Sequence, residues 1–185
     1  MLTRQQAYEK LQEMIKNKNL IKHCLAVEAA MLSYADYFDI NDEKEREKWA
    51  VAGILHDADW EKYPEKHPQV IVDWLKEQDA PEDIVNAVEA HGFEFGVEPK
   101  TLMAKVLRTV DELTGLIVAV ALVKGRNLDN VSVKTVLKKW KDKRFAAGVK
   151  REGIEKGAKE IGVPLEKHIE IVLEGMKKIK DKLGL

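Results

Sequence analysis

Apolar residues recur at helical spacing along almost the whole chain. In the second such segment Leu20, His23, Val27 and Tyr34 fall on one face of a helix. No alternation of apolar and polar residues is long enough to propose a sheet, and VSVKTV at 131–136 is the one short ambiguous run. The spacing marks nine segments, and we expect about eight helices among them: residues 3–18, 20–38, 41–57, 64–78, 81–92, 100–124, 131–142, 145–162 and 164–183.

Residues that favour helix ends mark several of these boundaries. Thr3 suits the start of the first helix, and Asn19 is expected to open the second. Pro64 lies where the first turn of a helix tolerates a proline. Pro68 falls inside the same segment, so that helix can instead begin near His67.

Length and composition favour one globular domain. A chain of 185 residues can bury its own core, and 45% hydrophobic with 34% charged residues is the balance of a soluble globular protein. No repeat and no low-complexity linker divides the chain. We expect an all-α, single-domain helical bundle over residues 1–185, with a core at about 19–124 and a C-terminal helical extension at about 131–185.

Net charge and the length of the apolar runs argue against binding to a nucleic acid polymer and against insertion into a membrane. A net charge of −1 gives no electrostatic case for a nucleic acid polymer or an anionic membrane. No apolar run reaches the roughly 18 residues of a membrane span, and MLTRQQAYEK lacks the apolar region of a signal peptide. Cys24, the only cysteine, can form neither an internal disulfide nor a cysteine-based zinc site. We expect a cytoplasmic protein.

Histidine is concentrated in the N-terminal half of the chain. Four of the five histidines lie on apolar faces of four different predicted helices, namely His23, His56, His67 and His91. A single histidine in such a place is more often a hydrogen-bonded core residue than a metal ligand. His168 also lies on an apolar face, with Leu165 and Val172. Placement on an apolar face therefore does not separate a ligand from a core histidine.

Two aspartates strengthen the case for a site. Asp111 shares the face of the apolar residues in its predicted helix, and Asp57 directly follows His56 at the end of another. An unpaired carboxylate in an apolar interior costs roughly several kcal/mol unless it is neutralised or bound to a cation. The aspartates can pair with histidines or with Arg108, or they can bind a divalent metal together with the histidines. Both interpretations stay open on these residues alone.

Neighbouring metal ligands need a particular local geometry. Residues i and i+1 face different ways on a helix, so His56 and Asp57 can converge on one ion only where the helix ends. The segment DADWEKYP, residues 57–64, fits an exit loop at that point. Asp57 has two oxygens and can therefore bridge two metals. Imidazole and carboxylate ligands without a thiolate favour Zn, Fe, Mn and related ions.

The order of these residues resembles the HD-domain superfamily of metal-dependent phosphohydrolases. An isolated histidine, a His-Asp doublet and a distant aspartate make up the family's core pattern, and His23, LHD at 55–57 and Asp111 match it. The phrases AVEAAM, HDADWEKYP, VDELTGLIVAVALV and KKWKDKRFAAGVKREGIEKG are similar to an uncharacterised bacterial and archaeal subgroup of predicted HD hydrolases. The family doublet is often followed by Ile-Gly, whereas this chain has Ala58 and Asp59.

The resemblance implies a ligand set for two metals. The first metal would be held by His23, His56, Asp57 and Asp111. Asp57 would bridge to the second metal, which His67 and His91 complete. The implied cofactor is one or two divalent ions, drawn from Mn, Fe, Co, Ni, Zn and Mg.

The resemblance also implies hydrolysis. The metal would lower the pKa of a bound water from about 15.7 towards about 7, and the hydroxide would attack phosphorus in line. The implied substrate is a nucleotide or another small phosphorylated molecule, with Asp57 as the catalytic residue. Two alternatives stay open: a di-iron oxygenase built on the HD fold, and a non-catalytic helical module that the metal only stabilises.

Basic residues in the C-terminal half offer candidates for binding the substrate phosphate. The segment KTVLKKWKDKRFAAGVKR, residues 134–151, holds eight lysines and arginines. Such a segment is usually a solvated face, and the functional interpretation assigns Lys139 and Arg151 to the phosphate. Asp59 and Glu61, just after the doublet, orient the ligands, act as general acids or are ordinary loop residues.

Overall fold

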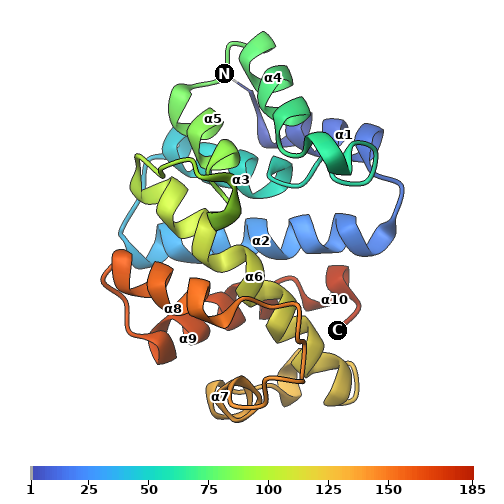
Figure 1. The fold of residues 1–185 in the computed structure, drawn as a ribbon, viewed down its shortest axis with the longest axis vertical. Coiled ribbons are helices and arrows are strands. Elements are labelled where there is room, and N and C mark those ends of the chain that lie inside the picture. The colour runs from blue at the N-terminus through green and yellow to red at the C-terminus, as the bar shows by residue number, and fades with distance from the viewer. Residues whose placement is uncertain (1) are drawn as a thin grey trace.

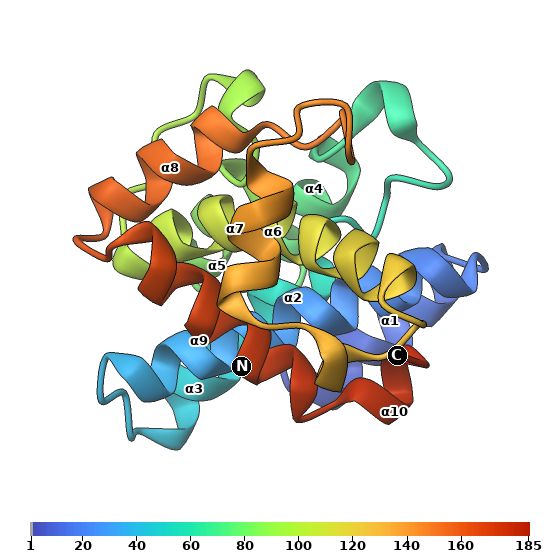
Figure 2. The ribbon, with the colours of Figure 1, turned by 90° about the horizontal axis from the view of Figure 1, so that it is seen from below.

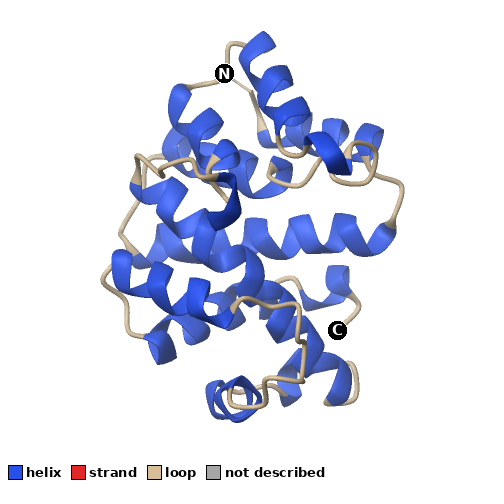
Figure 3. Ribbon diagram, viewed as in Figure 1, coloured by secondary structure: helices blue, strands red, loops and turns tan. Residues whose placement is uncertain are grey.

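The computed structural model describes residues 2–185, which form helices joined by turns and loops, without a strand (Figures 1 and 3). The expected all-α fold is confirmed, with ten α-helices among these residues. They are α1 (Arg4–Met14), α2 (Lys18–Tyr37), α3 (Glu43–Leu55), α4 (Gln69–Glu77), α5 (Glu82–Glu89), α6 (Leu102–Val123), α7 (Val133–Trp140), α8 (Arg151–Glu160), α9 (Leu165–Lys177) and α10 (Lys180–Leu183). Three short 3-10 helices are η1 (Pro64–Lys66), η2 (Phe93–Phe95) and η3 (Leu128–Asn130).

The first two helices start where side chains satisfy free backbone groups. Thr3 caps α1 as predicted, because its hydroxyl accepts a hydrogen bond from Gln6 N while Gln6 Oε1 accepts one from Thr3 N. α1 ends at Met14, earlier than predicted. Asn17 then caps α2, its side-chain oxygen lying 2.9 Å from Asn19 N. The prediction that Asn19 opens the second helix is therefore wrong by two residues.

Irregular backbone interrupts three of the other predicted helices, those at 64–78, 145–162 and 164–183. His67 lies between η1 and α4 rather than on a helix, since α4 begins only at Gln69. Residues 145–150 are not helical, and α8 begins at Arg151. The Arg151 guanidinium donates to Phe145 O at 2.6 Å, so a side chain satisfies a carbonyl that a helix would bond internally. The last predicted helix divides into α9 and α10.

α2 crosses the middle of the molecule (Figure 1). The helices α1, α3, α4 and α5 lie on one side of it and α7 to α10 on the other, while α6 passes across it. Seen from below, α7, α8 and α9 lie beside α6, on which all three pack (Figure 2). The C-terminal helices thus rest on the same two long helices, α2 and α6, that the N-terminal helices contact. The description of residues 1–185 as one domain stays a prediction.

A glycine sets the contact between α2 and α3. A Cβ at Gly53 would lie 2.8 Å from Glu28 Cα, so a larger residue would push the two helices apart. His56 follows Gly53 by about one helical turn. The close approach therefore holds His56 beside His23, with their Nε2 atoms 3.2 Å apart.

The helices share one continuous hydrophobic core. It draws its buried residues from α1 to α10, including Leu11, Met31, Leu75, Leu107 and Val172. No helix among residues 2–185 has the length and apolar character needed to cross a membrane.

His168 is a buried histidine within this core. Its Nδ1 accepts from the Tyr34 hydroxyl at 2.5 Å, and its Nε2 lies 3.1 Å from Thr109 Oγ1 and 3.2 Å from Thr109 O. These partners are neutral and do not compensate a buried positive charge. Burial therefore lowers the pKa of His168 from 6.5 to about 4. The side chain is a neutral core residue.

The lowered pKa predicts a pH dependence of stability. The unfolded chain protonates His168 below about pH 6.5 and the native state only near pH 4, so the free energy of unfolding falls as the pH drops through this window. His168→Gln removes the titration. From pH 7 to pH 5, urea denaturation should show the wild type losing about 2 kcal/mol more than His168→Gln. An equal loss in the two proteins would contradict the assignment.

Candidate metal centre

Six polar side chains from separate parts of the chain meet in the interior. They are His23 on α2, His56 and Asp57 at the end of α3, His67 before α4, His91 after α5 and Asp111 on α6. α3 ends at Leu55, with His56 as its C-cap. The break in the helix lets Asp57 turn toward the same place as His56, as neighbouring ligands require.

One group of potential ligands consists of His23, His56 and Asp111, whose ligand atoms lie within 4.8 Å of one another. His23 Nε2 lies 3.2 Å from His56 Nε2 and 3.0 Å from Asp111 Oδ1. His56 Nε2 lies 3.5 Å from the same carboxylate oxygen. Three helices, α2, α3 and α6, therefore aim one potential ligand atom each at a common point.

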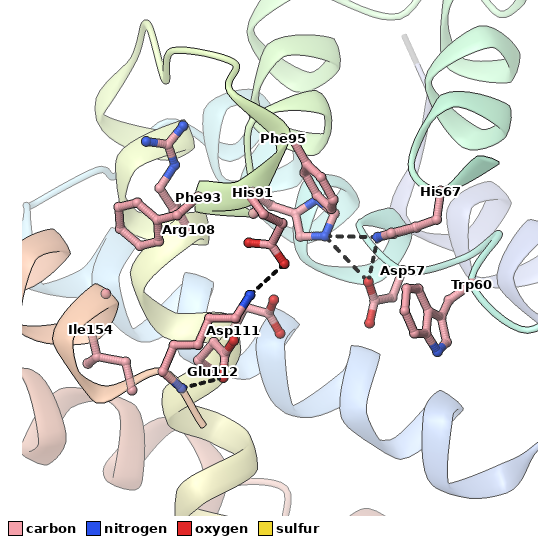
Figure 4. Close-up of a pocket in the computed structure, with 14 residues that line it drawn as sticks. Asp57, Trp60, His67, His91, Phe93, Phe95, Arg108, Asp111, Glu112 and Ile154 are labelled. Atoms are coloured by element: carbon pink, nitrogen blue, oxygen red, sulfur yellow. Dashed lines mark hydrogen bonds and ion pairs between the residues drawn. The ribbon is translucent and has the colours of Figure 1, made fainter. Parts of the chain in front are cut away.

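Asp57, His67 and His91 form a second group of the same kind. The Nε2 atoms of His67 and His91 are 3.2 Å apart, and Asp57 Oδ1 lies 3.3 Å and 3.4 Å from them (Figure 4). The other oxygen, Asp57 Oδ2, lies 3.5 Å from His23 Nε2 and 3.6 Å from His56 Nε2. Asp57 thus presents one oxygen to each group, which is the arrangement of a bridging carboxylate.

Hydrogen bonds at the opposite side of three imidazoles decide where their lone pairs point. His56 Nδ1 contacts Gly53 O at 2.8 Å, and His91 Nδ1 contacts Val88 O at 2.6 Å. A carbonyl oxygen only accepts, so each Nδ1 must carry a proton, and each neutral ring then has its lone pair on Nε2. The lone pair of His56 faces His23 Nε2, and that of His91 faces His67 Nε2. Both also face the carboxylate of Asp57, which can only accept hydrogen bonds. The donor set therefore fits a cation at each group.

Asp59 orients the third imidazole. Its Oδ1 accepts from His67 Nδ1 at 2.6 Å and its Oδ2 from Ile71 N at 3.0 Å, and the carboxylate is fully buried. Such a carboxylate behind a ligating histidine is common in metal sites. Of the interpretations for Asp59, the orienting one agrees with this geometry. Glu61 is a loop residue that accepts from the backbone N–H groups of Lys16 and Asn17.

Electrostatics couple the carboxylates to the imidazoles. Burial alone would raise the pKa of Asp57 and Asp111, but the surrounding histidines hold both well below their usual range. Burial likewise disfavours charge on His23 and His56, yet the neighbouring carboxylates raise the pKa of both. Protons on these imidazoles and a divalent ion are alternative sources of the positive charge, so metal binding should release protons.

Arg108 does not neutralise either aspartate. Its Nε donates to Ala90 O at 2.7 Å, and its Nη2 donates to Val97 O. The guanidinium also lies 4.9 Å from the centre of the Phe93 ring. The interpretation in which Arg108 pairs with Asp57 or Asp111 is therefore wrong, and within residues 2–185 the ion-pair partners of the two carboxylates are histidines.

One edge of the cluster is open to a cavity of about 180 Å³ (Figure 4). The side chains of Asp57 and Asp111 are 18% and 20% exposed there, whereas those of His67 and His91 are only 3% exposed. Phe95 covers these two histidines, with ring centres 5.5 Å and 5.1 Å away. A small molecule can therefore reach the carboxylates from the cavity but not the far side of the rings.

The two basic residues proposed for the phosphate do not line this cavity. Lys139 Nζ lies 4.6 Å from the centre of the Phe145 ring, and Arg151 is engaged by backbone carbonyls. Lys150 lines the cavity instead. It belongs to the same basic segment, whose composition alone does not show which of its cations face the cavity.

The geometry predicts a graded loss of metal. After loading with Mn²⁺, Asp57→Ala should lose both ions because it faces both groups, whereas His67→Ala should lose mainly the second. His168→Gln, a buried histidine outside the cluster, should retain the content of the wild type. Elemental analysis of the purified proteins measures this directly. Equal metal content in the wild type and Asp57→Ala would refute the site.

Comparison with known families agrees with this geometry. A family model described as HD domain matches residues 20–116, a region that contains all six side chains of the cluster. Searches of the curated proteins and of the solved structures found no match. HD domains bind divalent metals, and the two His/Asp groups described above could hold them. Because the match covers more than half of the 185 residues, the protein belongs to the HD-domain family.

Proposed function

We propose that the protein is a metal-dependent phosphohydrolase that cleaves a nucleotide or another small phosphoester. The observation that carries the proposal is the position of Asp57, which presents Oδ1 to His67 and His91 and Oδ2 to His23 and His56. Two adjacent cation sites that share a carboxylate suit phosphoester hydrolysis, in which a water oxygen attacks phosphorus and the ester oxygen leaves. Membership of the HD-domain family supports the same reaction class.

The residues of the chain would prepare this chemistry before a substrate arrives. A divalent ion supplies an activated water near pH 7 and positive charge beside the phosphoryl oxygens. Asp59 and the carbonyls of Gly53 and Val88 keep protons on Nδ1, so that the Nε2 atoms stay available as ligands. Asp57, the residue that we assign to catalysis, contacts both ligand groups, one with each carboxylate oxygen.

Aromatic side chains would limit the access of bulk water. Phe95 covers His67 and His91, and the Trp60 ring lies 5.1 Å from the centre of His67 while lining the same cavity. Electrostatic interactions are stronger where water is excluded, so this cover should strengthen the attraction between the centre and a phosphoryl group.

Lys150 is our candidate for binding the substrate phosphate, in place of Lys139 and Arg151. Its Nζ pairs with Glu94 Oε1 at 2.8 Å at the cavity, and its backbone N–H donates to Glu112 Oε2 at 3.2 Å. The Lys150 and Glu94 side chains are 55% and 53% exposed, and an ion pair so exposed contributes only about 0–1 kcal/mol. A substrate phosphate can therefore replace Glu94 at little cost.

The proposed reaction predicts phosphate release without oxygen. The protein loaded with Mn²⁺ or Fe²⁺ under nitrogen should release inorganic phosphate from at least one member of a panel of nucleotides and sugar phosphates. Asp57→Ala, treated identically, should not. Turnover that requires dioxygen and consumes it in proportion to product would instead assign the centre to the oxygenases. Full metal occupancy with no turnover in either atmosphere would favour a metal that only stabilises the fold.

The role of Lys150 predicts a change in substrate binding. Lys150→Met should raise KM by about tenfold with a smaller effect on kcat, since a hydrogen bond to a charged group contributes about 1.5 kcal/mol or more. Lys143→Met, an exposed residue in the same segment, is the matched control and should behave as the wild type. Steady-state kinetics on the substrate identified by the panel measure both. An unchanged KM for Lys150→Met would remove this lysine from the site.

A further inference from the structure

A second cavity adjoins the metal centre. It has a volume of about 390 Å³, and we call it the α6 groove. Its lining includes Lys22, His23, Gly115, Val118, Leu122 and Arg126. His23 is also a member of the first ligand group, and its side chain is 24% exposed. The α6 groove therefore begins at a side chain of the metal centre itself.

One turn of α6 separates the two cavities. Asp111 lines the smaller cavity, and Gly115 lines the α6 groove. Residues four apart on a helix share a face and lie about 6 Å apart along its axis. A Cβ at Gly115 would meet no atom within 4 Å, so open space starts directly beside the metal centre. His23 lines the α6 groove and its Nε2 lies 3.0 Å from Asp111 Oδ1, so side chains that line the two cavities meet at the metal centre.

The chemistry of the α6 groove is apolar with a basic rim. Val118 and Leu122 continue the face of Gly115 along α6, and Leu122 is 44% exposed. Lys22 and Arg126 line the same groove, and neither forms an ion pair with another residue in the range 2–185. An apolar floor beside two unpaired cations complements an anionic molecule that carries an apolar group.

We propose that the α6 groove binds the leaving group of the substrate, so that the enzyme prefers phosphoesters of an apolar, aromatic-sized group over small polar ones. This inference rests on the proposed phosphohydrolase function. The volumes divide the substrate in this way, because the cavity of about 180 Å³ at Asp57 and Asp111 suits the phosphoryl group and the groove of about 390 Å³ suits the larger organic part. Gly115 is then a specificity-determining residue, since any side chain there would fill the space next to the centre.

Two phosphonates that cannot be hydrolysed test the inference by calorimetry. Metal-loaded protein should bind 2-naphthylmethylphosphonate at least tenfold more tightly than methylphosphonate, because only the former has a group for the α6 groove. Gly115→Leu fills the groove and improves helix propensity, so it should fold and abolish the difference. Leu122→Glu should also reduce it, by placing a negative charge in the groove. Val123→Glu, the matched control, alters a neighbour that is 58% exposed and does not line the groove.

The possible outcomes separate this inference from the proposed function. Equal affinities for the two phosphonates, or a difference that survives in Gly115→Leu, would overturn it even if the protein hydrolyses phosphoesters. A naphthyl preference that Gly115→Leu removes would support it, and the binding data do not depend on turnover. Sedimentation provides a further check: a wild-type dimer that Leu122→Glu converts to a monomer would show that a second copy covers the groove, which would also overturn the inference.

Discussion

The structure depends on one electrostatic constraint: the ring nitrogens of four histidines and the carboxylate oxygens of Asp57 and Asp111 converge in the interior, where the two negative charges need a compensating positive charge. Carbonyl oxygens at His56 and His91 hold the proton on Nδ1, so the Nε2 atoms that face the aspartates have only lone pairs to offer while the rings are neutral. A positive charge is what makes such an arrangement stable. The close contact of α2 and α3 at Gly53 and the buried carboxylate of Asp59 both serve to maintain it.

Helical periodicity predicted which residues face the interior, but it did not distinguish a ligand such as His23 from a core histidine such as His168. His23 and Asp111 project from α2 and α6, where apolar spacing identifies the buried face. His67 and Asp59 lie in irregular segments, where local sequence patterns do not determine the direction of a side chain. The assignment of Lys139 and Arg151 to the phosphate rested only on the basic composition of residues 134–151, which does not show that Lys150 is the residue at the cavity. The family pattern supplied the histidine in the irregular segment, not its geometry.

The metal centre lies between two cavities that differ in size and lining. The one beside Asp57 and Lys150 is small and lined by charged and aromatic side chains, whereas the α6 groove is larger and has Val118 and Leu122 in its lining. Because one helix, α6, carries Asp111 and Gly115, it fixes the distance between the two cavities, and under our proposal this distance would separate the phosphoryl group from the organic part of the substrate. The C-terminal helices that pack on α2 and α6 thereby support both the metal ligands and the groove.

The claim that the cluster holds two metal ions bridged by Asp57 can be tested most directly by anomalous diffraction from crystals of Mn²⁺- or Fe²⁺-loaded protein. Two peaks about 3.5–4 Å apart are expected, the usual separation in two-metal sites. One should lie among His23, His56 and Asp111, and the other beside His67 and His91. Crystals loaded with saturating metal that show no peak between these side chains, with the histidines bonded only to the aspartates, would contradict it.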